Sequence, residues 1–180
     1  MIVLGLSGKK GAGKNLVYHL IKSVADPDET GVVARVSFAG PLKQMCRVEF
    51  GWNGQKDEIG RKLLQDVGVG MRALKKDFWV DKAADAIRSL PKTTVICVIT
   101  DLRFENEMKM IRGQFKGLAW RITRPGVENL DNHVSETELD GARFDRKIVN
   151  TTMDNLLSEV RSGVEELLRL YEDEDSKHSP

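Results

Sequence analysis

The stretch Met1–Asn15, MIVLGLSGKKGAGKN, decides the fold of this chain. A short apolar run, Ile2–Leu6, leads into a glycine-rich loop with the spacing G-x-x-x-x-G-K, and Leu16–Val24 then has the pattern of an amphipathic helix. Glycines let the backbone wrap closely around a phosphate, and the N–H groups at the start of the helix bind the anion. A strand, a glycine loop and a helix in this order predict a P-loop that binds a nucleoside triphosphate.

The loop residues form the predicted phosphate site. They are Gly8, Lys9, Lys10, Gly11, Ala12, Gly13 and Lys14, and the Lys14 ammonium group is expected to reach the β- and γ-phosphates. The next residue departs from the usual motif, because Asn15 stands where Ser or Thr normally binds Mg²⁺. Its amide oxygen could ligate the metal, directly or through water, or it could leave the metal to phosphates and waters.

Composition predicts a single cytoplasmic domain. The chain has 180 residues, enough to bury a substantial core, and we expect one P-loop domain over residues 1–171 and an acidic flexible tail over 172–180. The net charge of +1 argues against a nucleic-acid partner. No stretch is long enough to cross a membrane, and no basic region precedes the first apolar run as in a signal peptide. Cys46 and Cys97 are far apart and lack metal-binding spacing, and Cys97 lies in an apolar run, where we expect a buried free thiol of the kind that suits a reducing compartment.

Short apolar runs alternate with helical patterns along the chain. The predicted strands are Ile2–Leu6, Val32–Phe38, Thr94–Thr100, Leu118–Thr123 and Lys147–Asn150. The predicted helices are Lys14–Ala25, Pro41–Phe50, Asp57–Gly68, Asp77–Leu90, Glu105–Gln114 and Met153–Tyr171. This alternation predicts a three-layer α/β fold, in which a five-stranded, mostly parallel sheet carries helices on both faces. Ligands of such sheets bind beyond the carboxyl ends of the strands.

Several candidate residues follow those predicted strand ends. Asp101 comes directly after the apolar run Val95–Thr100, where a carboxylate would hold Mg²⁺ in a P-loop site; the alternative is an N-cap of the next helix. Arg103 would lie near the phosphates, and Glu107, four residues on, could orient it. A surface Arg–Glu pair of little energetic weight is the alternative for these two.

The polar segment between Arg124 and Leu139 has no clear period. A connection this long in a compact domain is usually functional or disordered. Since Arg121 and Arg124 stand at its entrance, we interpret residues 124–142 as a mobile lid over bound phosphates. The alternative is a solvated surface loop.

A second basic cluster lies in the middle of the chain. Arg61, Lys62 and Arg72 flank a predicted helix end and turn at Leu63–Gly68. An acceptor substrate that carries a phosphate needs a cationic pocket of its own, for which arginine is well suited. Charge alone favours the alternative, a solvated basic helix face.

In this order of motifs the chain resembles the phage-type deoxynucleoside monophosphate kinases. The resemblance rests on Leu6–Lys14, Phe38–Lys43, Arg61–Gln65 with Val67–Gly68, Phe78–Val80, Asp101–Arg103 with Glu107, and Arg124–Gly126 with His133–Glu136. It implies a P-loop kinase fold, ATP and Mg²⁺ as cofactors, and transfer of the ATP γ-phosphate to a deoxynucleoside monophosphate in a bacteriophage setting. It implies neither nucleic-acid nor membrane partners and leaves a homodimer open.

The resemblance also implies roles for individual residues. Lys14 and the loop amides would hold ATP; Asp101 would act at the Mg²⁺ site or near the acceptor; and Arg103, Arg121 and Arg124 would gather around the transferred group. Acceptor binding would fall to Arg61, Gln65, Arg72, Trp79 and Glu107, lid closure to His133, Ser135 and Glu136, and contact with adenine to Asn150. The family has Asp where this chain has Asn15, and its larger members carry an insert where Gly51–Gly60 is short here.

Two other functions compete with this interpretation. The stretch His133–Glu136, with Leu139-Asp140, Phe144-Asp145 and Ile148–Asn150, is also similar to animal-type phosphomevalonate kinases. A nucleotide-binding switch without transferase activity would need the P-loop but no acceptor pocket, and the basic cluster with Arg61 and Arg72 speaks against it.

Overall fold

The computed structural model describes residues 1–127 and 137–176. The chain divides into two compact units, one formed by residues 1–35 and 90–180 and the other by residues 36–89. We call them the sheet unit and the helical unit and describe each by itself. The expected domain boundary at residue 171 stays a prediction.

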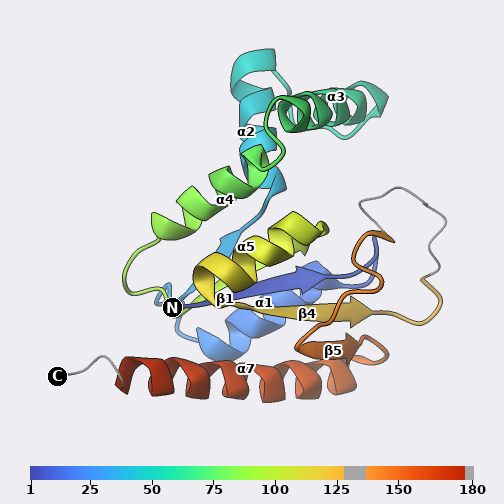
Figure 1. Cartoon of the computed structure of the whole chain (residues 1–180). Helices are drawn as coiled ribbons and strands as arrows, with labels where there is room; N and C mark the ends of the chain where they lie inside the picture. The colour runs from blue at the N-terminus through green and yellow to red at the C-terminus, as the bar shows by residue number, and fades with distance from the viewer. Residues whose placement is uncertain (128–136, 177–180) are drawn as a thin grey trace. The chain divides into compact units, whose positions relative to one another are not determined.

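A five-stranded sheet forms the centre of the sheet unit (Figure 1). Its strands are β1 (Ile2–Ser7), β2 (Val33–Val36), β3 (Ile96–Leu102), β4 (Leu118–Thr123) and β5 (Arg146–Val149), in the spatial order β2-β3-β1-β4-β5. Strand β1 runs parallel to β3 and β4, and β4 runs parallel to β5. All six residues of β1 are buried, as expected for a central strand covered on both faces. The expected α/β fold is confirmed.

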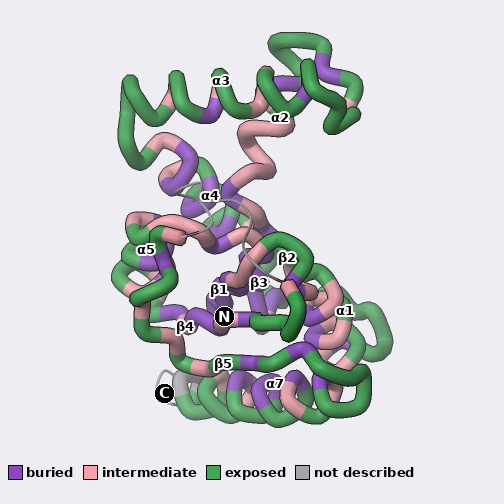
Figure 2. The backbone as a smooth tube through the Cα atoms, turned by 90° about the vertical axis from the view of Figure 1, so that its right-hand side faces the viewer, coloured by how far each residue is buried: buried purple, intermediate pink, exposed green. Residues whose placement is uncertain are grey.

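Helices cover the two faces of this sheet. Helices α1 (Lys14–Ala25) and α7 (Met153–Ser176) pack on one face and α5 (Glu105–Phe115) on the other (Figure 1). Because side chains alternate along a strand, β1 sends Ile2, Leu4 and Leu6 into the core with α1 and α7. On the other face, a Cβ atom on Gly5 would lie only 2.7 Å from Cδ1 of Ile111 in α5. Figure 2 shows the buried strands between these layers.

A glycine in α7 lets this helix pack closely against Trp120 of the sheet. This indole in β4 is 2% exposed, and it lies directly against Gly163 in the middle of α7. Glycine lowers helix propensity, yet a Cβ atom at residue 163 would lie 2.7 Å from Cζ2 of the indole. The glycine therefore makes room for the largest buried side chain on this face.

Three helices make up the helical unit: α2 (Ala39–Phe50), α3 (Glu58–Leu74) and α4 (Phe78–Arg88). The carboxylate of Asp57 caps α3 by accepting the N–H of Gly60 at 2.7 Å. The predicted turn at Leu63–Gly68 is wrong, because α3 continues through Gly68 to Leu74. Gly68 is buried where α3 meets its neighbours, and its carbonyl accepts the indole N–H of Trp79 at 3.2 Å. Tertiary packing overrides the low helix propensity of glycine there.

Other element bounds agree with the predicted ones more closely. Helix α1 has the predicted bounds, while α7 continues past Tyr171 to Ser176. Cys97 is buried in β3, where desolvation raises the pKa of its thiol to about 12. Within residues 1–127 and 137–176, no helix is long and apolar enough to span a membrane.

Replacing Gly163 by alanine tests the packing of α7 against Trp120. The added methyl group must displace a rigid, buried ring, so we expect Gly163→Ala to lower the free energy of unfolding by about 1–3 kcal/mol. The matched control is Gly113→Ala in α5, where a Cβ atom would meet nothing within 4 Å; relief of glycine entropy should raise stability there by up to about 1 kcal/mol. Urea unfolding of both variants measures this, and equal effects of the same sign would contradict the packing argument.

Candidate active site

The P-loop forms the turn between β1 and α1. Its glycines adopt positive φ angles of +149° at Gly8, +84° at Gly11 and +104° at Gly13, a region that side chains strongly disfavour. A Cβ atom on Gly8 would also overlap the carbonyl oxygen of Ile122 in β4. The loop can therefore pass this close to its neighbouring strand only with glycine at residue 8.

Lys14 turns back into the loop that precedes it. Its ammonium group donates hydrogen bonds to the carbonyl oxygens of Gly8 and of Lys9, the latter at 3.0 Å. Lys14 is also the first residue of α1. The cation and the positive end of the helix dipole thus lie together at the loop, an arrangement that binds anions.

Asn150 braces the P-loop from the side of β5. It follows the last residue of β5, is 8% exposed, and donates from Nδ2 to the carbonyl oxygen of Ala12 at 3.0 Å. Its own backbone N–H is bonded to the carbonyl of Thr123 at 2.7 Å. The same amide packs so closely on Gly13 that a Cβ atom there would overlap it. The predicted contact of Asn150 with adenine stays a prediction, whereas its contact with the loop backbone is observed.

Asp140 connects two cations of the site. Its carboxylate pairs with Lys9 of the P-loop at 2.7 Å and with Arg121 of β4 at 2.5 Å. Arg121 also donates to the hydroxyl of Ser7 at 3.0 Å, and its guanidinium carbon lies 5.5 Å from the ring centre of Phe144. Burial would raise the pKa of Asp140, but the hydrogen bonds from Lys9 and Arg121 outweigh it and lower that pKa. Asp140 therefore stays ionised and neutralises part of the local charge.

The residues around Asp140 fix the chain just before β5. Leu139 is buried, and the carboxylate of Glu138 accepts the backbone N–H of Glu105, the first residue of α5, at 2.7 Å. The interpretation of residues 124–142 as a lid stays a prediction, because residues 128–136 are outside the described part of the chain. His133, Ser135 and Glu136 fall in that gap, whereas Arg124 is exposed in a turn closed by its carbonyl and the N–H of Val127.

The predicted end of β3 is wrong, because the strand continues through Asp101 to Leu102. Between the pairs Gly5–Ile99 and Ser7–Leu102, β3 advances one residue more than β1 does. Such a bulge re-aims side chains at a strand end. Thr100 and Asp101 are the residues of this bulge, at the edge of the sheet where the P-loop begins.

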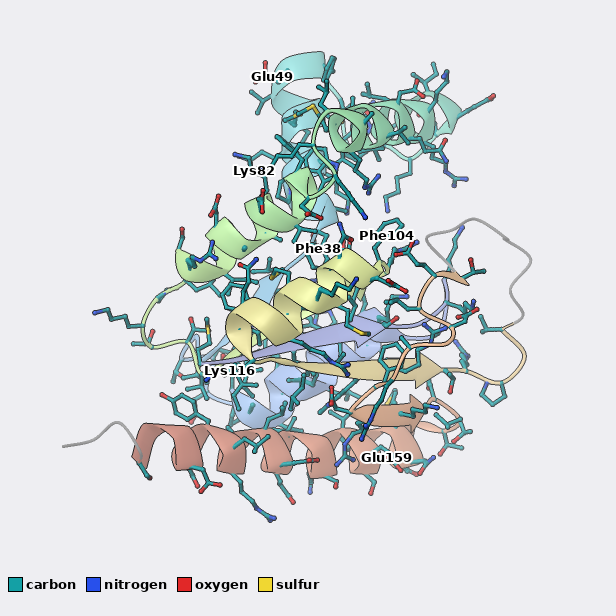
Figure 3. All side chains as sticks on the ribbon, viewed as in Figure 1. Phe38, Glu49, Lys82, Phe104, Lys116 and Glu159 are labelled. Carbon is teal, nitrogen blue, oxygen red and sulfur yellow. The ribbon has the colours of Figure 1, made fainter. Side chains whose placement is uncertain are left out.

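Glu107 holds the backbone at Arg103. This buried carboxylate accepts the N–H of Arg103 at 2.7 Å and that of Phe104 at 3.0 Å. Phe104 precedes the first turn of α5, and Figure 3 shows it at the opposite end of that helix from Lys116. Glu107 thus holds the backbone of Arg103, and the carboxylate fixes where the half-buried arginine leaves the strand.

Asn15 faces Arg35, a residue that the sequence analysis did not select. Nη2 of Arg35 donates to the amide oxygen of Asn15 at 2.7 Å. Mg²⁺ in kinases usually takes one or two protein oxygens and completes its shell with phosphates and water. The role of Asp101 at such a site stays a prediction, and the Asn15 oxygen accepts a hydrogen bond from Arg35. Among residues 1–127 and 137–176, no three His, Cys, Asp or Glu side chains gather as a metal site.

Four of the predicted acceptor residues form two groups within the helical unit, while the fifth, Glu107, lies in α5 of the sheet unit. Arg61 and Gln65 line a shallow hollow of about 670 Å³ on α3, together with Lys62 and Asp66. Arg72 donates to the carbonyl of Gly68 at 3.2 Å, and so does the buried indole of Trp79. The first group is open to solvent, while Trp79 serves the packing of the helices.

Sequence reasoning missed Arg35 and the role of Asp140. A signal existed for Arg35, because a lone charged residue near the carboxyl end of an apolar strand is typical of a site residue in a parallel sheet. No local pattern marks Asp140, whose partners are 131 and 19 residues away in the chain.

Comparisons with known proteins show what this chain is similar to. The family of deoxynucleotide monophosphate kinases matches residues 48–161. A protein of Acanthamoeba polyphaga mimivirus that carries the provisional name deoxynucleotide monophosphate kinase is 31% identical over 194 residues, with 92% of this chain and 97% of that protein covered. Among solved structures, a gluconokinase from Sinorhizobium meliloti 1021 is similar with a TM-score of 0.48 and 16% identity, over 99% of this chain and 98% of its own.

Changing Asp140 to asparagine tests its ion pairs. The pKa of Asp140 is lowered by folding, so these pairs stabilise the protein above about pH 4, and the stabilisation is lost as the pH falls through the lowered pKa. We expect Asp140→Asn to lower the free energy of unfolding by up to about 1 kcal/mol at neutral pH, the scale of partly exposed pairs. Urea unfolding from pH 7 down to about pH 3 should show the two proteins converge. A difference that does not change with pH would contradict this origin.

Changing Asn150 to aspartate tests the brace on the P-loop. A carboxylate would face the Ala12 carbonyl, so an acceptor would oppose an acceptor where a donor now lies. We expect Asn150→Asp to weaken ATP binding about tenfold or more and to lower the melting temperature. Asn155→Asp, the same change at an exposed residue of α7, is the control; calorimetric titration with ATP measures both. Equal ATP affinity in the two variants would show that the brace does not matter for binding.

Proposed function

This chain belongs to the deoxynucleotide monophosphate kinase family, and we propose that it transfers the γ-phosphoryl group of ATP to a deoxynucleoside monophosphate. An oxygen of the acceptor phosphate attacks the γ-phosphorus, the bond to the bridging oxygen breaks, and ADP and the deoxynucleoside diphosphate leave. The observation that supports this reaction best is the P-loop between β1 and α1, where Lys14 turns back onto the loop backbone and the glycines hold positive φ angles. A loop of this kind at a helix N-terminus suits a phosphate group.

Positioning and charge supply the rate in this proposal. The acceptor oxygen is already ionised near neutral pH, so the reaction needs no strong base and no covalent intermediate. Lys14 would hold the β- and γ-phosphates, and Arg103, with Arg121 and Arg124, would neutralise charge on the transferred group. Mg²⁺, when bound near Asp101, would offset the charge of the β- and γ-phosphate oxygens. Arg61 and Arg72 would bind the acceptor phosphate.

Glu107 supports the role of Arg103 in this scheme. A transition-state arginine must be held before the reaction begins, since ordering it later costs entropy. The buried carboxylate of Glu107 fixes the backbone of both Arg103 and Phe104, which limits where the guanidinium can reach. The cytoplasm, with its supply of ATP and deoxynucleotides, is the proposed location, and a homodimer stays a proposal.

An acceptor survey tests the function. Release of ADP from ATP and Mg²⁺ should depend on at least one deoxynucleoside monophosphate, measured with a coupled assay against each of the common bases. AMP and phosphomevalonate are the control acceptors. Turnover with phosphomevalonate and with no deoxynucleotide would show that the chain is a phosphomevalonate kinase instead. Intact ATP binding without any acceptor-dependent turnover would favour a nucleotide-binding switch.

Removing the Arg103 side chain tests the transition-state role. We expect Arg103→Ala to lower kcat by about 10³-fold or more, the scale of an arginine that neutralises the transferred phosphoryl group. The two hydrogen bonds from Glu107 to backbone N–H groups do not involve the Arg103 side chain, so they should survive this change, and the melting temperature of the variant checks that it folds. Arg169→Ala, an exposed position on α7, is the control. An unchanged kcat in Arg103→Ala would rule the role out.

A further inference from the structure

Arg35 in β2 reaches across to two other elements of the sheet unit. Its Nε and Nη2 atoms donate to the hydroxyl of Thr100 in β3 at 3.2 and 3.0 Å. Nη2 also donates to the amide oxygen of Asn15 in α1 at 2.7 Å. The guanidinium carbon lies 4.9 Å from the ring centre of Tyr18. Holding an exposed arginine in one conformation costs side-chain entropy. The four interactions of this guanidinium group offset that cost and fix its orientation.

The partners of Arg35 are all neutral. They are an amide, a hydroxyl and an aromatic ring, and no ion pair within residues 1–127 and 137–176 includes Arg35. The cations Lys9 and Arg121 differ, because Asp140 pairs with both. Neutral acceptors orient a guanidinium group without cancelling its charge. Arg35 therefore presents an uncompensated positive charge.

This charge lies beside the P-loop. Asn15 directly follows Lys14 in the chain, and Thr100 lies in the bulge of β3 next to Asp101. Both partners thus flank the carboxyl edge of the sheet, where open α/β sheets bind their ligands. A planar guanidinium group in a fixed orientation at such an edge is well suited to bind phosphate, because its N–H donors match the phosphate oxygens.

We propose that Arg35 is a phosphate-binding residue of the nucleotide site and that Asn15 is its positioning residue. The proposal rests on the proposed function for the identity of the nucleotide, but not for the presence of a phosphate site. In this arrangement the Asn15 oxygen serves the guanidinium group rather than Mg²⁺. A neutral side chain at residue 15 has a purpose here, since a carboxylate would pair with Arg35 and cancel the charge that binds phosphate.

Binding measurements on the whole chain test the assignment. Arg35→Met removes the charge, and Arg35→Gln removes it while keeping a donor for Thr100, should the first variant be unstable. We expect each to weaken binding of ATP or of a deoxynucleoside monophosphate by about 10- to 100-fold, the scale of a hydrogen bond to a charged group. Arg161→Met on the exposed side of α7 is the matched control and should bind as the wild type does. Calorimetry with ATP alone and with the monophosphate alone distinguishes the donor phosphates from the acceptor phosphate.

Variants of Asn15 test the positioning role. Asn15→Asp should weaken phosphate binding in the absence of Mg²⁺ about as much as Arg35→Gln does, because the new carboxylate pairs with Arg35. In Asn15→Ala, the Mg²⁺ concentration for half-maximal ATP binding should stay within about twofold of the wild-type value, since the amide is not a metal ligand in this assignment. If the Mg²⁺ concentration for half-maximal ATP binding rises tenfold or more in Asn15→Ala, Asn15 is a metal ligand and its positioning role is overturned.

The proposal fails if both Arg35 variants fold as the wild type does and bind ATP and the monophosphates within twofold of it. Its failure is distinguishable from failure of the proposed function, which is measured by turnover with acceptors. A chain that phosphorylates no deoxynucleotide but loses ATP binding on Arg35→Gln would contradict the acceptor and support the role of Arg35.

Discussion

The close passage of the P-loop between two strand ends is the constraint on which the site depends. At Gly8 the loop lies against the carbonyl of Ile122, and at Gly13 it lies against the amide of Asn150. Neither place has room for a Cβ atom, and both glycines hold positive φ angles. The loop conformation, the position of Lys14 and the start of α1 all follow from this packing. β4 and β5 therefore shape the P-loop from outside the motif, because the parallel sheet brings their carboxyl ends beside that of β1.

Charge around the loop is divided between compensated and uncompensated cations. Asp140 neutralises part of the charge of Lys9 and Arg121, and Lys14 bonds to backbone carbonyls. Arg35 instead rests on neutral partners, among them Asn15. Cations that lie close together repel one another and destabilise the folded state. A carboxylate such as Asp140 reduces this repulsion between Lys9 and Arg121. The neutral residue after Lys14 thus has a physical explanation that does not require a metal.

Particular residues show where sequence patterns were sufficient and where they were not. The bounds of α1 followed from apolar periodicity and from the glycines before it, because both are local properties. The continuation of α3 through Gly68 did not, since the packing of Trp79 and α2 against that glycine comes from outside the helix. The bulge that places Asp101 within β3 depends on the register with β1, which a single strand's pattern does not contain.

The sequence by itself determined the three-layer fold, the P-loop and the kinase family, because strand and helix periods and the spacing of glycines and lysine are written along the chain. It also placed Asp101 and Arg103 at the carboxyl end of a strand, where β3 ends at Leu102. Only the tertiary structure decided which charges meet: Asp140 with Lys9 and Arg121, Asn150 with the loop backbone, and Arg35 with Asn15 and Thr100. These partners lie 19 to 138 residues apart in the chain, so their contacts follow from strand order and register, which local patterns do not specify.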